Sequence, residues 1–353
     1  MLSNLIVIEL ASVLAGPDVG MFFSELGAKV IKIENKLTGG DVTRNWKLSS
    51  EPTENNVSAY FSSVNWNKEY LFLNLSLKED QEQVYELVKT ADIVIANFKP
   101  GDDKKLGMNY EKLKSYNPKI IFGEINGYGE SNKRAAYDVV LQAETGFMSM
   151  NGTPESGPIK MPIALIDVLA AHQLKEGLLL ALLQKEKTGK GSKVEVSLYD
   201  SALASLKNQA TNWLMNKHIP RPIGSLHPNI APYGETFTTK DNKTIVLAIG
   251  SDNQFIKLLE IIGAKKLIEN PLYKSNQLRV KNRNQLDNDL TPYFKNFNRA
   301  ELMEQFIEIN IPVGALNNMK EVFENDASKD LILEEEIDGI KTRRVKTVIF
   351  KIS

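Results

Sequence analysis

The residue types available to this chain narrow the chemistry that it can perform. It has no cysteine and only three histidines, His172, His218 and His227. The lack of cysteine excludes disulfides, thiolate catalysis and cysteine-ligated zinc, and the histidine spacings match no metal motif. A Ser-His-Asp triad stays open, although the sequence contains no G-x-S-x-G elbow. We therefore expect the nucleophile or base to be a carboxylate, a hydroxyl, a lysine or water, and we expect no metal site.

Asp167 is the acid best placed for such chemistry. It stands alone between an apolar run at 164–166 and an apolar helix expected over 167–184. Apolar flanks of this kind limit the access of water to the carboxylate. Asp is also a favoured helix N-cap, because its side chain accepts a backbone N–H there. The residues alone leave both roles open, and the two roles are compatible.

The segment 5–34 indicates the architecture that would position such a site. An apolar run at 5–10 is followed by the small-residue turn Ala15-Gly16-Pro17, an amphipathic stretch and a second β-branched run at 29–34. This order is typical of a βαβ unit, which requires a parallel sheet with its ligands at the carboxyl ends of the strands. The turn lacks the G-x-G-x-x-G pattern of dinucleotide sites. A prediction of a nicotinamide oxidoreductase would therefore rest on the βαβ pattern alone.

Strand-like and helix-like segments alternate through the first part of the chain, which predicts an α/β fold. Further strands are expected over 70–75, 92–97, 119–125 and 193–198, and a helix over 79–89. The helix over 167–184 is apolar nearly all round, which predicts that it is buried. We expect His172, within this helix, to be a core histidine.

Four prolines between Pro220 and Pro232 predict a linker, because their fixed φ angles and missing donors discourage regular structure. We expect a large Rossmann-like domain with a parallel sheet over 1–215, the linker over 216–232 and a smaller α+β domain over 233–315. A strand-like segment over 344–352 predicts that residues 316–353 return to the large domain.

The bulk composition limits the partners. Lys plus Arg number 43 and Asp plus Glu 44 in 353 residues, so no net charge attracts nucleic acid or an anionic membrane. No apolar run approaches the ~20 residues of a membrane-spanning helix. We expect a cytoplasmic protein, with which the lack of cysteine is compatible.

Several motifs, in order, resemble those of the family III coenzyme A transferases, the group of formyl-CoA and carnitine-CoA transferases. The resemblance runs through almost the whole chain. Its anchors are Ala15-Gly16-Pro17, the segment 26–34, Gly40-Asp41-Val42-Thr43-Arg44, Asn65-Trp66-Asn67-Lys68, the segments 91–101 and 137–143, Thr188-Gly189-Lys190-Gly191 and His227-Pro228.

The resemblance implies that Asp167 is the catalytic nucleophile. It would attack an acyl-CoA thioester to form a mixed anhydride, then carry coenzyme A as an aspartyl-CoA thioester before passing it to a second acid. Coenzyme A would be a substrate, with no permanently bound cofactor. The resemblance also implies an interlocked homodimer.

Candidate coenzyme A contacts follow by position from the same resemblance. In the large domain they are Leu14, Ala15, Arg44, Leu73, Asn74, Leu75, Ser76, Asn97, Phe98, Lys105 and Tyr137. For Arg44 and Lys105 the alternative is a solvated surface charge. In the small domain, Gly250 and Ser251 match a loop that would stabilise the oxyanion, or they form an ordinary capped turn.

Two other functions remain open within the same resemblance. Acyl-CoA racemases of this fold carry a histidine directly before the acid that Asp138 matches, whereas this chain has Tyr137 there, which favours transfer over racemisation. A non-catalytic acyl-CoA-binding protein is the other alternative, against which Asp167 argues.

Overall fold

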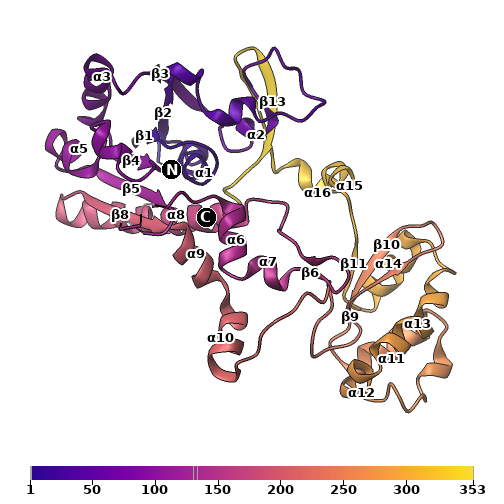
Figure 1. Cartoon of the computed structure of the whole chain (residues 1–353). Coiled ribbons are helices and arrows are strands. Elements are labelled where there is room, and N and C mark those ends of the chain that lie inside the picture. The colour runs from indigo at the N-terminus through magenta and orange to yellow at the C-terminus, as the bar shows by residue number, and fades with distance from the viewer. Residues whose placement is uncertain (1, 130, 133, 353) are drawn as a thin grey trace. The chain divides into compact units, whose positions relative to one another are not determined.

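Six parallel strands form the main sheet of the structure (Figure 1). The structure, a computed structural model, describes residues 2–129, 131–132 and 134–352. The strand order is β3-β2-β1-β4-β5-β8. The strands are β1 (Ile6–Leu10), β2 (Lys29–Asn35), β3 (Lys68–Leu73), β4 (Ile93–Ala96), β5 (Ile121–Asn126) and β8 (Ser192–Ser197). The predicted α/β fold with a parallel sheet is confirmed, and its order reverses between β1 and β4, where such sheets bind ligands.

Helices cover both faces of the sheet. Val7 of β1 packs into a core with α1 (Ala15–Glu25) and α8 (Leu165–Thr188). The next residue, Ile8, points the other way and packs into a core with α3 (Lys78–Val88) and α5 (Tyr110–Tyr116). Because strand side chains alternate between faces, a continuously apolar strand such as β1 fits between two helical layers.

Two glycines allow α1 to lie close to β1 and the turn after it. A Cβ at Gly16 would stand 2.3 Å from the Ala11 Cβ, and one at Gly20 would stand 1.8 Å from the Glu9 Oε2. These positions therefore need glycine for helix–strand packing, which accounts for glycines that do not form a dinucleotide fingerprint.

The helix α8 is not buried all round, which corrects the expectation from its composition. Leu180 is 67% exposed and Leu183 is 55% exposed. His172 is also exposed and is therefore not a core histidine. An apolar pattern alone does not tell a helix face that packs on the core from one that the single chain leaves uncovered.

The chain divides into two compact units, Met1–Pro222 with Asp330–Ser353 and Ile223–Lys329, here called the large and the small unit. The first boundary, between residues 222 and 223, falls within the linker expected over 216–232. The second boundary, between residues 329 and 330, lies 14 residues after position 316, where the chain was expected to return to the large domain. The hairpin of β12 (Ile332–Ile337) and β13 (Ile340–Val345) belongs to the large unit, where Ile337 packs with Val57 and Phe61.

Short helices and turns complete the large unit. They are α2 (Ala59–Ser62), α4 (Asp102–Lys105), α6 (Asp138–Glu144), α7 (Phe147–Met150), α9 (Leu198–Ser205) and α10 (Lys207–Asn216), the strand pair β6 (Gly152–Thr153) and β7 (Gly157–Pro158), and the 3-10 turns Lys36–Thr38 and Val42–Asn45. No helix in the described ranges is long and apolar enough to cross a bilayer.

The small unit has an antiparallel sheet of order β11-β10-β9 and its own core, which includes Phe237, Leu258 and Phe294. Its elements are β9 (Tyr233–Thr238), β10 (Thr244–Ala248), β11 (Val313–Ala315), the 3-10 turn Lys265–Leu267, and the helices α11 (Asp252–Ile261), α12 (Asn276–Lys281), α13 (Arg283–Phe294), α14 (Arg299–Glu308), α15 (Met319–Glu324) and α16 (Asp326–Lys329).

Candidate active site

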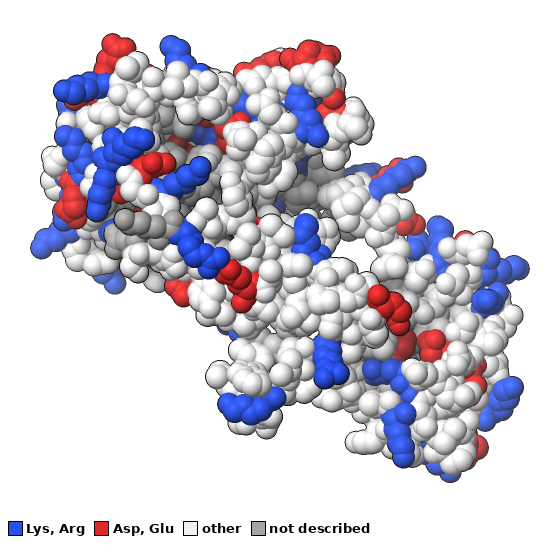
Figure 2. Space-filling view, in the orientation of Figure 1, with Lys and Arg blue, Asp and Glu red and all other residues white. Residues whose placement is uncertain are grey.

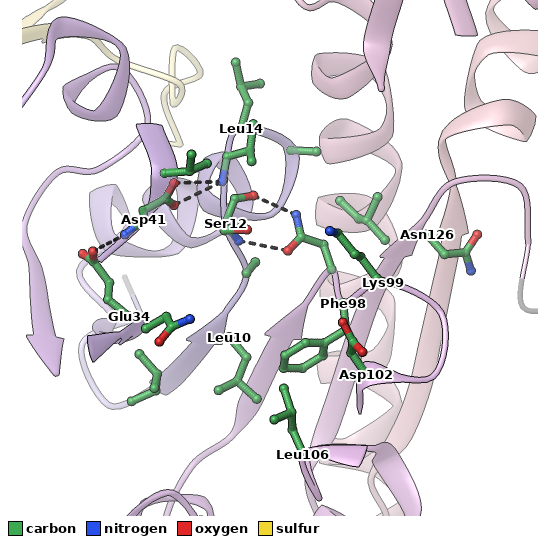
Figure 3. Close-up of a pocket in the computed structure, with 18 of the residues that line it drawn as sticks. Leu10, Ser12, Leu14, Glu34, Asp41, Phe98, Lys99, Asp102, Leu106 and Asn126 are labelled. Atoms are coloured by element: carbon green, nitrogen blue, oxygen red, sulfur yellow. Dashed lines mark hydrogen bonds between the residues drawn. The ribbon is translucent and has the colours of Figure 1, made fainter. Parts of the chain in front are cut away.

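A cavity of about 610 Å³ lies in the large unit at the carboxyl edge of the sheet. Segments that follow β1, β2, β3, β4 and β5 all contribute to its wall, as expected where parallel strands end (Figure 3). Its volume is in the range of small-molecule sites. Among the described residues, no group of acids and histidines could hold a metal ion.

Most of the predicted site residues line this one cavity. They are Leu14, Ala15, Leu73, Asn74, Leu75, Ser76, Asn97, Phe98, Tyr137 and Asp167. Arg44 and Lys105 of the large unit are not part of the lining, and Gly250 and Ser251 belong to the small unit.

Asp167 is the third residue of α8, whose N-cap is Ala164, so it is not the cap that the sequence left open. Burial, and after it the nearby Asp138 carboxylate, raise the pKa of Asp167 to about 7. The protonated and the ionised forms of this carboxyl group therefore both occur near neutral pH. In its ionised form it is a poorly solvated anion, which is the more reactive kind of carboxylate nucleophile.

Asp138 holds the start of α8 from another helix. Its Oδ1 accepts the Ile166 N–H at 2.7 Å and its Oδ2 accepts from the Gln142 side chain at 2.6 Å. The Gln142 Oε1 in turn accepts the Met161 N–H at 2.8 Å. Asp138 thus satisfies an N–H that α8 leaves free and fixes the turn that carries Asp167.

The aromatic residue beside Asp138 bears on the racemase alternative. Tyr137 is 58% exposed and lines the cavity. None of the described residues in the lining is a histidine. The pair of acid and histidine that proton exchange would need is therefore not present in this wall.

Asn97 uses its side chain within the protein. Its Oδ1 accepts the Ser12 N–H at 2.9 Å and its Nδ2 donates to the Ser12 carbonyl at 2.8 Å. Asn97 therefore ties the end of β4 to the turn after β1, while Phe98 and Lys99 beside it also line the cavity (Figure 3).

Arg44 is fully buried and paired inside the large unit. Its Nε and Nη2 each lie 2.7 Å from a Glu34 carboxylate oxygen, and its Nη1 donates to the Asn56 carbonyl at 2.9 Å. The guanidinium also lies 3.9 Å from the centre of the Phe61 ring. Arg44 thus joins the segments around the site and is not exposed to a phosphate.

Lys105 is exposed on α4, and Asp102 of the same helix lines the cavity. In the small unit, Ser251 is the N-cap of α11, with its Oγ accepting the Gln254 N–H at 3.2 Å. Gly250 donates its N–H to the Gln254 Oε1 at 2.9 Å. This is a capped strand-to-helix turn, and an oxyanion role for it stays a prediction.

The cavity wall contains buried charges that were not predicted from the sequence. Lys32, Glu34 and Asp41 all line the cavity, and all three are nearly inaccessible to solvent. Burial acts to raise the pKa of Asp41, but the Lys32 ammonium and the hydrogen bonds from Thr43 hold it below its ordinary value. The signal that was available is the polar sequence Gly40-Asp41-Val42-Thr43-Arg44, which served only as an anchor of the resemblance.

Comparisons with known proteins identify the family of this chain. The model of CoA-transferase family III matches residues 2–352. A succinate–glutarate CoA-transferase of Agrobacterium fabrum is 35% identical over 328 residues, covering 91% of this chain and 81% of the relative. The human succinyl-CoA:glutarate CoA-transferase is 34% identical, with coverage of 90% and 72%.

Solved structures give the same result. A CaiB/BaiF family protein from Brucella suis has a TM-score of 0.88 and 34% identity, covering 99% of this chain and 92% of that one. Sequence and fold thus agree over nearly the full length, and the chain belongs to CoA-transferase family III.

Proposed function

We propose that this enzyme moves coenzyme A from an acyl-CoA thioester to a free carboxylic acid through covalent intermediates on Asp167. The observation that carries the proposal is the position of Asp167. It is a partly buried carboxylate in the same cavity as the residues expected to contact coenzyme A.

The proposed reaction is a series of four displacements. An Asp167 oxygen attacks the thioester carbonyl, the C–S bond breaks, and coenzyme A leaves as a thiolate. The first acid is then joined to Asp167 as a mixed anhydride. The thiolate attacks the aspartyl carbonyl, which releases the first acid as a carboxylate and forms an aspartyl-CoA thioester. The second acid then attacks that thioester and again displaces the thiolate. The thiolate finally attacks the acyl carbon of the new anhydride, which yields the new acyl-CoA and free Asp167.

The surroundings of Asp167 support this sequence. An anhydride is lost if water reaches it, and burial of the carboxylate limits that access. With a pKa of about 7, the Asp167 carboxyl can be ionised near neutral pH, and its burial keeps the carboxylate weakly solvated. Asp138 supports the geometry by holding the N-terminus of α8 in place.

The names of the relatives suggest which acids to test first. Relatives are named for transfer between succinate and glutarate and between acetyl-CoA and oxalate. We therefore propose short carboxylic acids as donors and acceptors, with dicarboxylic acids as the first to test.

A homodimer in the cytoplasm completes the proposal. Support for the dimer comes from apolar side chains that the single chain leaves exposed on α8 and α10, including Leu180, Leu214 and Met215. The lack of cysteine is compatible with a reducing compartment such as the cytoplasm.

Replacement of the nucleophile tests the reaction. Asp167→Ala is assayed for transfer from succinyl-CoA to glutarate by mass spectrometry of the CoA esters, with Asp326→Ala on the exposed end of α16 as the control. We expect transfer to fall by about 10³-fold or more in Asp167→Ala only, with coenzyme A binding retained. Transfer that survives in Asp167→Ala would overturn the covalent route, and binding without transfer in the wild type would leave a binding protein.

A further inference from the structure

The turn between β1 and α1 contains a strained residue. Val13 has a φ of +71°, in the left-handed region. The other described non-glycine residues with positive φ are asparagine, lysine or aspartate, which have no branch at Cβ. This conformation is costly for valine, because its branched Cβ crowds the backbone. Such a residue persists only where its surroundings hold it.

Hydrogen bonds hold the peptide groups of this turn on both sides. The Val13 N–H donates to the Asp41 carboxylate, at 3.1 Å from Oδ2 and 3.4 Å from Oδ1. The carbonyl of Ala11 accepts from the Lys32 Nζ at 2.7 Å. The Ser12 N–H donates to the side-chain amide oxygen of Asn97, and the Ser12 carbonyl accepts from the nitrogen of the same amide (Figure 3).

Asp41 is itself held by buried charges. The Lys32 Nζ lies 3.2 Å from the Asp41 Oδ2 and 2.8 Å from the Glu9 Oε1. With the Ala11 carbonyl, these acceptors use the three donors of the ammonium. Thr43 donates to the Asp41 Oδ1 from its N–H at 3.0 Å and from its Oγ1 at 2.8 Å. All four side chains are buried, which limits the access of water to their charges.

The turn ends at the free N-terminus of α1. Leu14 is the N-cap and its side chain makes no capping hydrogen bond. Within the described chain, the N–H groups of Leu14, Ala15 and Gly16 donate to no other group. Leu14 and Ala15 line the cavity, so their N–H groups are available to an oxygen atom of a bound ligand.

We propose that Asp41, oriented by Lys32 and Glu9, is a positioning residue that holds Val13 in its strained conformation and thereby aims the first N–H groups of α1 at bound coenzyme A. The inference rests on the proposed function for the identity of the ligand. In this role Asp41 acts through the backbone of residues 13–15.

The test combines Asp41→Ala, Asp41→Asn and Val13→Gly. We measure the Kd of coenzyme A by calorimetry, and KM and kcat for transfer. Asp41→Ala should raise the Kd and the KM by about 10- to 100-fold, with a smaller change in kcat, because the turn relaxes and its N–H groups turn away. Asp41→Asn should lose less, since the amide oxygen still accepts the Val13 N–H.

Val13→Gly provides the rescue. Glycine adopts a positive φ without strain, so Val13→Gly combined with Asp41→Ala should recover at least severalfold of the lost affinity. The wild type should protect the Val13 amide from hydrogen exchange, and Asp41→Ala should expose it, because alanine has no acceptor for the Val13 N–H. If Asp41→Ala does not fold, the same comparison is made between Asp41→Asn and Val13→Gly/Asp41→Asn.

Asp92 provides a matched control. Its carboxylate also accepts a backbone N–H, from Ile6 at 3.1 Å, and pairs with a lysine, Lys185, at 2.8 Å, but it precedes β4 and lies outside the cavity lining. Asp92→Asn should lower stability and leave the Kd of coenzyme A unchanged.

Normal Kd and KM in folded Asp41→Ala, or no recovery with Val13→Gly, would overturn the positioning role. Failure of the proposed function gives a different result. The wild type would then lack transfer, while amide exchange at Val13 would still depend on Asp41.

Discussion

The Asp167 carboxylate lies where its ionised form is costly. Burial and the neighbouring Asp138 charge raise its pKa to about 7, from a usual value of 3.8. Burial that would shield an anhydride from water thus also destabilises the free carboxylate. A site of this kind trades folding stability for reactivity.

Asp167→Asn should therefore stabilise the folded enzyme. The folded state binds a proton on Asp167 more tightly than the unfolded state, so the wild type loses stability as the pH rises from about 4 to 7. Asparagine does not titrate. The free energy of unfolding of Asp167→Asn should therefore exceed that of the wild type by an amount that grows over this pH range. The excess should reach about 1–3 kcal/mol, allowing for the partial exposure of Asp167, and stay constant above pH 7. Urea unfolding from pH 5 to pH 8 measures it, and a difference independent of pH would contradict the environment described for Asp167.

Asp138→Asn should lower the pKa of Asp167. The substitution removes the like charge but keeps an oxygen that can accept the Ile166 N–H. The rise of the transfer rate with pH should then move to lower pH, and the relative rate at pH 6 should increase. Asp138→Ala is the comparison, because it also removes the cap of α8 and should lower stability by about 1 kcal/mol. An unshifted profile in Asp138→Asn would show that Asp138 acts only as a cap.

At the residue scale the sequence predicted Asp167 but not its support. A lone acid before an apolar helix is visible in the sequence, whereas the bond from Asp138 to that helix joins residues 28 positions apart. Arg44 shows the same limit. Its residue type suggests a phosphate contact, and only the folded chain shows that Glu34 already occupies its guanidinium.

At the scale of elements, Gly20→Ala should destabilise the enzyme by about 2 kcal/mol or more. The new Cβ would lie 1.8 Å from a buried Glu9 oxygen that pairs with Lys68, so the helix or the ion pair must move. The comparison is Gly250→Ala, whose Cβ would lie 3.6 Å from its nearest neighbour. Thermal unfolding measures both. Equal, small losses in the two variants would mean that α1 does not pack on β1 as closely as described.

The sequence predicted the main elements well because the strands are apolar and the helices amphipathic. Residues 119–125 were expected as a strand, and β5 spans Ile121–Asn126. The C-terminal strand was expected near 344–352, but β13 ends at Val345. The burial of α8 could not be predicted, because apolar residues on opposite faces do not reveal which face packs on the core.

At the scale of the whole molecule, the exposed apolar surface should support the proposed dimer. Leu180 is 67% exposed and Met215 is 75% exposed, a costly state for a protein that stays monomeric. Light scattering after gel filtration should give the mass of two chains for the wild type. Leu180→Glu combined with Met215→Glu should shift the mass toward one chain, and the matched change Lys320→Glu on exposed α15 should not. A monomeric wild type at micromolar concentration would contradict the dimer.

The order of the strands, and with it the site, required the folded chain. Local patterns predict a βαβ unit, but they do not state that β1 pairs with both β2 and β4. That pairing creates the reversal of strand order at which the cavity lies. The buried charges of Lys32 and Asp41 come from different segments and meet only there.

The most direct test of the account is to trap the covalent intermediate. The wild type is mixed with an acyl-CoA in the absence of acceptor, treated with hydroxylamine, digested and examined by peptide mass spectrometry. We predict a hydroxamate on Asp167, which requires prior acyl-CoA and is not formed in Asp167→Asn. A hydroxamate on another residue, or none in an enzyme that still transfers coenzyme A, would contradict catalysis through Asp167.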